Sequence, residues 1–253
     1  MLQKLISWWR FGCCLVLMFL IISGSYLIYP FVPLAVWRCY CHRPWARAML
    51  WAIGAKLEVS TSLDKKYIQP NTMFVQNHIS WLDTLVMSSV YCTNYVGKIE
   101  MLRWKLLRNL IKSGGTVFID RKNKRDLLMA NKRIAKVLND GWAMGLFPEG
   151  TTSDGSSVLP FHASIFESAM LAKSTVVPVT LRYRLENGDI ASEVTFAKKR
   201  WMESVWSTLR LPKLIIKIDI LEPVKAEDFA KRELLSDYMY QQISDVYHSD
   251  LIR

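Results

Sequence analysis

The sequence predicts an α/β fold, in which a mostly parallel sheet is covered by helices on both faces and preceded by an N-terminal membrane-embedded helical segment. Two observations lead to this prediction. An uncharged apolar run extends from Phe11 to Val36, and short β-like runs alternate with helix-like stretches after Leu57. The 253 residues, 51% of them hydrophobic, can bury one large core, and they contain no repeat or Gly/Ser linker. We therefore expect an anchoring segment at residues 1–56 and one α/β domain at residues 57–253.

The apolar run is long enough to enter a bilayer. About 20 apolar residues span the hydrocarbon core, and the run reaches from Phe11 to Tyr29 before Pro30 and Pro33 stop or bend the helix. A secretory signal peptide has a shorter apolar region, followed by a small-residue cleavage site. The run here is longer, and no such cleavage site follows it. A buried core helix is usually shorter as well. The sequence therefore favours a membrane segment.

Basic residues flank this run on both sides, with Lys4 and Arg10 before it and Arg38, Arg43, Arg47 and Lys56 after it. The positive-inside rule then places both ends in the cytoplasm. A shallow helical hairpin broken at residues 29–33 satisfies the rule, and so does a single span with the larger C-terminal cluster inside. Residues 44–57 mix tryptophans and basic residues with apolar ones, as expected of a helix at headgroup level. We expect the protein at the cytoplasmic face of the inner (plasma) membrane.

The remaining chain divides into predicted strands and helices. Seven runs rich in β-branched or aromatic residues predict strands at residues 57–61, 72–76, 115–120, 143–147, 175–183, 193–197 and 214–220. Five other stretches predict helices at residues 81–91, 101–112, 124–139, 161–172 and 226–251. Ligands of such sheets bind at the carboxyl ends of the strands, so residues that follow a strand are the candidates for a site.

The net charge of +11 indicates a negatively charged partner. Twelve Lys and Arg residues lie between Lys98 and Lys136, against three acidic residues. Zinc-finger spacing, RNP-like aromatic motifs and heptads are absent, so we expect no nucleic acid. The five cysteines form no paired CxxC units and the four histidines are scattered, which predicts a reducing compartment and no metal site. The charge is therefore assigned to anionic lipid and a phosphorylated substrate.

His78 is the strongest candidate for a general base. In NHISWLD it follows a strand-like run, and Asp83 comes five residues later, after a Ser80 suited to begin a helix. On one continuous helix the two side chains would point about 140° apart, so they meet only if the chain turns between them. In that arrangement His78 takes a proton from a hydroxyl, and Asp83 holds the tautomer and stabilises the imidazolium. The spacing alone is also compatible with the alternative that His78 is a structural histidine held by hydrogen bonds.

Other predicted strand ends offer groups that bind anions. In GLFPEGTTSDG, Glu149 and Gly150 follow a strand, where a carboxylate and backbone N–H groups orient an acceptor or support an oxyanion site. An ordinary turn with a solvated Glu149 is the alternative. Arg121 closes the GTVFID run, and Lys98 stands at another possible strand end. A guanidinium at the same edge of the sheet suits phosphate.

Together these segments resemble the motifs of the PlsC-like glycerolipid acyltransferases, the lysophosphatidic acid acyltransferase family. NHISWLD resembles the family's NH-x4-D motif, YVGKIEM the segment that bears its lysine, GGTVFIDR its second motif with the arginine, LFPEGT its third and VVPVTL its fourth. The five motifs follow the family's order from about residue 75 to residue 181, and the apolar N-terminal segment fits as well.

The resemblance implies that residues 57–253 are an acyltransferase domain. It would move a fatty acyl group from acyl-CoA or acyl-carrier protein to the free hydroxyl of lysophosphatidic acid, by direct attack, with no acyl-enzyme and no cofactor. Carried over by motif position, His78 is the base and Asp83 its partner. The implied substrate-binding residues are Lys98 and Arg121 for phosphate, and Asn77, Glu149, Gly150, Thr151 and Pro178 around the acceptor. The chain lacks the G-x-S-x-G of a serine hydrolase, and no nucleophilic serine is required.

One departure from the family leaves the acceptor open. Many members read FPEGTR, whereas Thr152 follows Thr151 here, so a positive charge expected near the acceptor phosphate is missing. Either Lys98 and Arg121 suffice, or the acceptor is another lysolipid, such as a lyso-ornithine lipid. An alternative of another class is a non-catalytic membrane-bound lipid-binding protein, which applies if the histidine and aspartate of the first motif do not meet.

Overall fold

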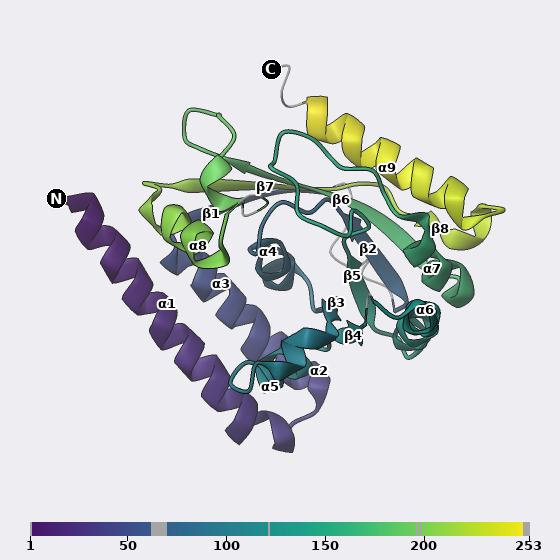
Figure 1. Ribbon diagram of the computed structural model, residues 1–253, viewed down its shortest axis with the longest axis horizontal. Helices are drawn as coiled ribbons and strands as arrows, with labels where there is room; N and C mark the ends of the chain where they lie inside the picture. Colours follow the sequence, from purple (N-terminus) through teal and green to yellow (C-terminus); the bar gives the residue numbers. More distant parts are fainter. Residues whose placement is uncertain (1, 62–69, 121, 196, 198, 250–253) are drawn as a thin grey trace.

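A sheet of eight described strands runs through the middle of the molecule in the computed structural model (Figure 1). The structure describes residues 2–61, 70–120, 122–195, 197 and 199–249. The strand order is β1-β7-β6-β2-β5-β3-β4, with β8 beside β6. Strand β6 is antiparallel to β7 and β8, and the other pairs are parallel, which confirms the predicted mostly parallel sheet. The strands are β1 (Ala55–Thr61), β2 (Thr72–Gln76), β3 (Thr93–Lys98), β4 (Val117–Ile119), β5 (Ala143–Leu146), β6 (Thr175–Arg184), β7 (Leu214–Ile220) and β8 (Val224–Lys225).

Helices cover both faces of this sheet. On one face lie α1, α3, α4 and α8, and on the other lie α6, α7 and α9 (Figure 1). The helices are α1 (Leu2–Leu27), α2 (Leu34–Val36), α3 (Arg43–Ala52), α4 (Asp83–Val90), α5 (Arg108–Ser113), α6 (Lys124–Asn139), α7 (Glu167–Ala172), α8 (Trp201–Arg210) and α9 (Arg232–Ser249). Short 3-10 helices join several of these elements, and Trp37–His42 forms a π-helix.

The central strands read as continuous apolar runs because both of their faces are covered. All five residues of β2 are buried, and so are nine of the ten residues of β6. Strand β7 alternates between fully and partly buried residues. These patterns explain why the strands predicted at residues 72–76 and 214–220 are confirmed with the same bounds.

The predicted helix at residues 124–139 is confirmed as α6. The side chain of Asn123 accepts hydrogen bonds from the backbone N–H groups of Arg125 and Asp126 at 3.0 and 3.3 Å, which begins the helix. At the other end Gly141 has a φ of 87°, a conformation that glycine adopts without strain. Local capping therefore fixes both ends of this helix.

Other predicted elements are wrong or incomplete. The strand predicted at residues 193–197 begins as a 3-10 helix at Ser192–Val194, because the carbonyl of Val194 accepts hydrogen bonds from serine hydroxyls and not from a neighbouring strand. The helix predicted at residues 101–112 breaks at Trp104 into a 3-10 helix and α5. Strands β3 and β8 and helix α8 were not predicted as elements.

Helix α1 lies along one side of the molecule, where it packs against α8, α3 and α5 (Figure 1). Gln3–Phe31 has the length and hydropathy of a membrane-crossing helix, the only described segment that does. Its outer side carries large exposed apolar side chains, including Trp9, Phe19 and Leu27, each at least 70% exposed. The helix therefore presents one side to the body of the protein and one apolar side to its surroundings.

Residues 1–56 share a core with the rest of the chain. After the turn at residues 29–36 the chain returns through α3, which packs against α4 and β1. Met49, Leu50 and Ile53 are buried in the same core as the central strands. The anchoring segment and the α/β domain are thus joined by buried apolar contacts, not only by sequence.

This shared core predicts that trimming α3 destabilises the whole domain. Leu50→Ala, at a side chain 2% exposed, should lower the free energy of unfolding by about 2–5 kcal/mol. The neighbouring Trp51 is 76% exposed, so Trp51→Ala should change it by less than about 0.5 kcal/mol. Denaturant unfolding in detergent measures both variants. Equal stability of the two would show that α3 contributes no core to the domain.

Candidate active site

The candidate site lies where β2 and β5 end side by side. Val75 of β2 pairs in parallel with Leu146 of β5, so both strands end at the same edge of the sheet. His78 follows β2 by two residues, and Phe147 follows β5 directly. The chain segments that hold the first and third sequence motifs are therefore neighbours, as expected for a parallel sheet.

His78 and Asp83 meet at this edge. The His78 Nδ1 atom lies 2.6 Å from the Asp83 Oδ2 atom. The chain turns between them, since α4 begins only at Asp83. The Ser80 hydroxyl contributes to this turn by accepting a hydrogen bond from the backbone N–H of Leu82 at 3.3 Å. The expected turn and the expected contact are both present.

Asp83 is completely buried and accepts four hydrogen bonds. Its Oδ2 accepts from the His78 ring and from the backbone N–H groups of Ile79 and Ser80, at 2.8 and 2.9 Å. Its Oδ1 accepts from the Tyr183 hydroxyl at 2.6 Å. Burial and the adjacent carboxylate raise the pKa of Tyr183 well above its usual value, so the hydroxyl keeps its proton.

These contacts define which nitrogen of His78 is free to react. An oxygen that accepts two backbone N–H groups is an acceptor toward the ring as well, so Nδ1 of the neutral imidazole carries the proton. Nε2 then has a free lone pair. The His78 side chain is 22% exposed, so the ring is not sealed inside the protein. The pair is therefore arranged to accept a proton from a bound hydroxyl.

Glu149 holds the backbone of His78 from the neighbouring loop. Its carboxyl oxygens accept hydrogen bonds from the backbone N–H of His78 at 2.8 Å and of Leu159 at 3.3 Å. Burial raises the pKa of Glu149 to about 8, although both N–H groups act in the opposite direction. The side chain is only 3% exposed, so the alternative of a solvated Glu149 is wrong. The Phe147 ring stacks on the imidazole of His78 with centroids 4.1 Å apart.

Asn77 supports the site from within the sheet. It is 1% exposed, its amide nitrogen donates to the carbonyl of Leu181 at 2.9 Å, and its amide oxygen accepts from the N–H of Leu181 at 2.8 Å. All of these contacts join the end of β2 to β6. The structure therefore places this predicted substrate-binding residue in a position that orients His78, with no exposed surface toward a substrate.

Pro178 is buried within β6, opposite Val75. The chain tolerates proline there because β6 changes partners at this point, from β8 at Val176 to β7 at Val179. Its carbonyl accepts a hydrogen bond from the N–H of Leu221 at 3.0 Å. Pro178 thus lies one residue pair before the end of β2, where Gln76 pairs with Val179.

Gly150 and Thr151 form the turn after Glu149. Gly150 has a φ of 68°, and a Cβ there would lie 3.2 Å from the His162 ring, so both its backbone and its surroundings favour glycine. Thr151 is exposed beside it, and Thr152 is partly exposed. The turn therefore offers backbone and hydroxyl groups next to the His78 loop.

Lys98, one of the two predicted phosphate ligands, lies on the other side of β5 from the histidine. Lys98 is exposed at the carboxyl end of β3, where it pairs with Ile119 of β4. Arg121, two residues further, lies outside the described residues. Register alone therefore brings Lys98 to the same edge as the histidine, and the role of Arg121 stays a prediction.

Two neighbours of the pair were missed in the sequence. Tyr183 lies 100 residues after Asp83, and Phe147 precedes the proline of the third motif. The sequence of β6 contained a signal for Tyr183, because Val177, Val179 and Leu181 lie on the same face of the strand as Tyr183. A hydroxyl at the end of a buried apolar face needs a buried acceptor. No sequence pattern indicates the ring stacking of Phe147.

The fold and the site define an α/β enzyme with a histidine–carboxylate pair at the carboxyl ends of its strands, and within the described residues no cluster of metal-ligating side chains accompanies it. Comparison with known proteins gives the family. The acyltransferase family model matches residues 58–182. The 1-acyl-sn-glycerol-3-phosphate acyltransferase of Neisseria gonorrhoeae is 35% identical over 81% of this chain and 79% of its own length. The chain belongs to the PlsC-like acyltransferase family, and it is an acyltransferase of the lysophospholipid type.

Other similarities agree with this assignment. The corresponding Neisseria meningitidis enzyme is 33% identical over the same shares of both chains. A lyso-ornithine lipid O-acyltransferase of Pseudomonas aeruginosa is 29% identical over 76% of this chain and 72% of its own. The crystal structure of PlsC from Thermotoga maritima superposes with a TM-score of 0.66 over 99% of this chain and 97% of that one, at 18% identity, which supports the fold. Membership of an enzyme family disfavours the non-catalytic alternative.

The hydrogen bond from Tyr183 predicts a loss of activity in Tyr183→Phe. Without that donor Asp83 is left with an unsatisfied oxygen, so kcat should fall by about tenfold and stability by about 1–2 kcal/mol. Tyr247→Phe is the matched control, because Tyr247 is equally buried and its hydroxyl donates to the carbonyl of Gly155. It should lose similar stability and keep its kcat. Steady-state kinetics and thermal unfolding distinguish the two, and an unchanged kcat in Tyr183→Phe would contradict the role of this hydroxyl.

The buried Glu149 predicts a pH-dependent stability. Its pKa is raised from 4.5 to about 8, so between these values the folded state binds more protons than the unfolded state. The free energy of unfolding should therefore fall as pH rises from about 5 to 8, and Glu149→Gln should flatten this slope. Glu227→Gln, at an exposed site, should keep the slope. Denaturant unfolding at several pH values measures it, and identical slopes in all three proteins would contradict the burial effect.

Proposed function

We propose that the protein transfers a fatty acyl group from acyl-CoA or acyl-carrier protein to the free hydroxyl of 1-acyl-sn-glycerol-3-phosphate, which yields phosphatidic acid for phospholipid biosynthesis. The single observation that carries this proposal is the contact between His78 and Asp83, which leaves Nε2 of the imidazole free to take a proton. The names of the two Neisseria relatives, each of which matches 81% of this chain, support the acceptor.

In the proposed reaction His78 is the general base. Its Nε2 takes the proton of the acceptor hydroxyl as the hydroxyl oxygen attacks the thioester carbonyl carbon. The tetrahedral intermediate then collapses, the C–S bond breaks, and the proton passes from His78 to the leaving thiolate. Asp83 stabilises the transient imidazolium. The reaction needs no cofactor, and no acyl-enzyme forms.

The acceptor phosphate is bound by cations at the same edge of the sheet. Lys98 supports this role by its exposed position at the end of β3. Arg121, from the second motif, is the other proposed ligand, and a guanidinium fork suits phosphate geometry. Gly150 and Thr151 shape the acceptor site beside the histidine, and Glu149 supports it by holding the backbone of His78. The basic segment that surrounds the two cations increases the local concentration of anionic substrates.

Helix α1 supports a proposed location of this site at the membrane surface. Its contacts with α8, α3 and α5 keep the helix on the body, so its exposed apolar side lies in the interfacial layer without crossing the bilayer. Basic residues on both flanks then lie on the same side, the cytoplasmic face of the inner membrane. An acceptor whose acyl chain stays in the bilayer reaches the enzyme from that layer.

Acyl transfer by purified protein tests the proposal. With labelled acyl-CoA or acyl-carrier protein and lysophosphatidic acid, His78→Ala should lower kcat by about 10²–10⁴-fold and leave membrane association intact. His248→Ala changes a histidine whose ring bonds the Ser244 carbonyl on α9, and it should keep full activity. Full activity of His78→Ala would refute the mechanism, and transfer to other lysolipids only would refute the acceptor.

A lyso-ornithine lipid is the second candidate acceptor. Thr152 is partly exposed in the turn beside the pair and offers no positive charge to an acceptor phosphate. Relatives named lyso-ornithine lipid O-acyltransferase, such as that of Pseudomonas aeruginosa, support this alternative. An acceptor without a phosphate needs no cation at this position.

The charge at position 152 gives a test of acceptor choice. Thr152→Arg should raise kcat/KM for lysophosphatidic acid relative to lyso-ornithine lipid by roughly tenfold, because a charge-assisted hydrogen bond to phosphate is gained. Thr152→Gln, similar in size and uncharged, should leave the ratio unchanged. A competition assay with both acceptors measures the ratio. If Thr152→Arg does not change it, the turn does not contact the acceptor headgroup.

A further inference from the structure

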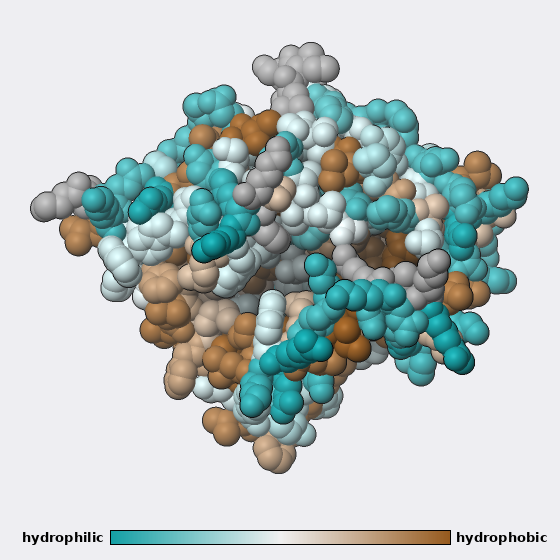
Figure 2. All heavy atoms as spheres, in the orientation of Figure 1, coloured by the Kyte–Doolittle hydropathy of each residue, from teal (hydrophilic) through white to brown (hydrophobic). Residues whose placement is uncertain are grey.

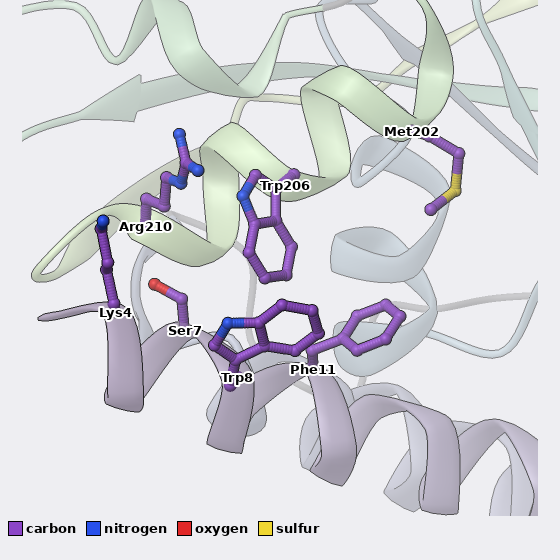
Figure 3. A pocket seen from close by; sticks show the side chains of 7 residues that line it. All are labelled: Lys4, Ser7, Trp8, Phe11, Met202, Trp206 and Arg210. Carbon is purple, nitrogen blue, oxygen red and sulfur yellow. The ribbon is translucent and has the colours of Figure 1, made fainter.

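A groove lies between α1 and α8, away from the catalytic edge. It has a volume of about 520 Å³, a size that accommodates a small-molecule ligand, and none of the residues that line it belongs to the site of His78. The two helices run antiparallel, so the start of α1 lies beside the end of α8 (Figure 3). On α1 the lining residues recur at intervals of three and four, from Lys4 to Phe11, which places them on one side of the helix.

The middle of the groove is apolar and aromatic. The rings of Trp8 and Trp206 meet edge to face with centroids 4.8 Å apart, and Phe11 lies 5.9 Å from Trp206 (Figure 3). Met202 also lines the groove, on the side where Phe11 lies (Figure 3). Trp8 and Met202 are 61% and 55% exposed, so the apolar wall is open to the surroundings and is not filled by the protein itself.

The other end of the groove is cationic. Lys4 of α1 and Arg210 of α8 both line this end, and the Lys4 side chain points from α1 toward α8 (Figure 3). Among the described residues neither has a carboxylate partner within ion-pair distance, and Arg210 instead lies over the Trp206 ring at 5.4 Å from its centroid. Two cations without counter-ions at the end of an aromatic groove match an amphiphile with an anionic headgroup.

The groove is preformed, because hydrogen bonds fix one helix to the other. The Arg10 guanidinium donates to the carbonyls of Leu209, Leu211 and Pro212 at the end of α8, and the Gln3 amide donates to the carbonyl of Arg210 at 2.8 Å. These bonds satisfy carbonyls that a helix end leaves free. A ligand therefore meets walls that need little reorganisation on binding.

The groove also opens on the apolar surface of the molecule. Leu5, Trp9, Leu15 and Phe19 of α1 are exposed on the same helix, and apolar side chains follow the edge of the molecule where α1 lies (Figure 2). We propose that the groove binds one anionic phospholipid of the bilayer, with its phosphate between Lys4 and Arg210 and its acyl chain along Trp8, Phe11 and Trp206. This site is separate from the catalytic one and does not depend on the identity of the acceptor.

Binding of a short-chain anionic lipid tests this site. The full chain, purified and delipidated in non-ionic detergent, is titrated with dioctanoyl phosphatidylglycerol or dioctanoyl phosphatidylcholine, and the bound lipid is counted by native mass spectrometry. The wild-type protein should bind the anionic lipid about tenfold more tightly than the zwitterionic one. Lys4→Gln/Arg210→Gln should remove this preference, and Lys4→Arg should retain it.

Two controls separate the groove from non-specific attraction. Lys132→Gln/Lys225→Gln removes the same charge from α6 and β8, far from the groove, and should bind like the wild type. Trp8→Ala should weaken binding of both lipids, whereas Trp104→Ala, at a tryptophan 53% exposed elsewhere, should not. Equal losses in the two charge variants, or no preference for the anionic lipid in the wild type, would overturn the proposal. Inorganic phosphate that competes at the same concentration as the lipid would also overturn it, because the apolar wall would then contribute nothing.

Discussion

The Asp83 carboxylate, buried and surrounded by four hydrogen-bond donors, is the group on which the catalytic geometry depends. A buried carboxylate costs several kcal/mol unless it is paired and hydrogen-bonded. Its donors come from the loop after β2 and from Tyr183 in β6, so the charge is stabilised only when these two strands lie side by side. The paired amide of Asn77 adds two bonds between the same strands one residue before the histidine. Assembly of the sheet and assembly of the histidine pair are therefore one process.

Glu149 adds a second constraint from the other side of β2. Its carboxyl group joins the backbone of His78 to that of Leu159, so the loop after β5 cannot move without moving the histidine. The imidazole is held by Asp83 at Nδ1, by Phe147 on its ring face and by Glu149 through its main chain. A base oriented from three directions loses little entropy when it meets a substrate hydroxyl. The Glu149 side chain thus acts on the chemistry through position, and it was assigned from sequence to the acceptor.

The sequence predicted those parts of the structure that depend on local patterns. Apolar spacing and caps determine α6, and continuous burial determines β2 and β6, because in each case neighbouring residues decide the conformation. Strand β3 escaped prediction because TNYVGK mixes polar with apolar residues, and its pairing with β5 and β4 is decided by distant segments. For the site, the turn from His78 to Asp83 was predictable from their spacing. The buried state of Glu149 and the partner of the Tyr183 hydroxyl were not, because both depend on which strands become neighbours.

Direct contacts also fix the position of the histidine loop relative to the apolar side of α1. The Val194 carbonyl accepts hydrogen bonds from the Ser80 hydroxyl of the histidine loop at 2.7 Å and from the Ser204 hydroxyl of α8 at 2.9 Å. Trp81 and Trp201 meet edge to face beside this junction. Since α8 in turn holds α1, the catalytic loop is connected to the apolar surface through hydrogen bonds and ring contacts, without a flexible linker. In the proposed mechanism an acceptor held in the bilayer therefore meets His78 at a height that these contacts fix.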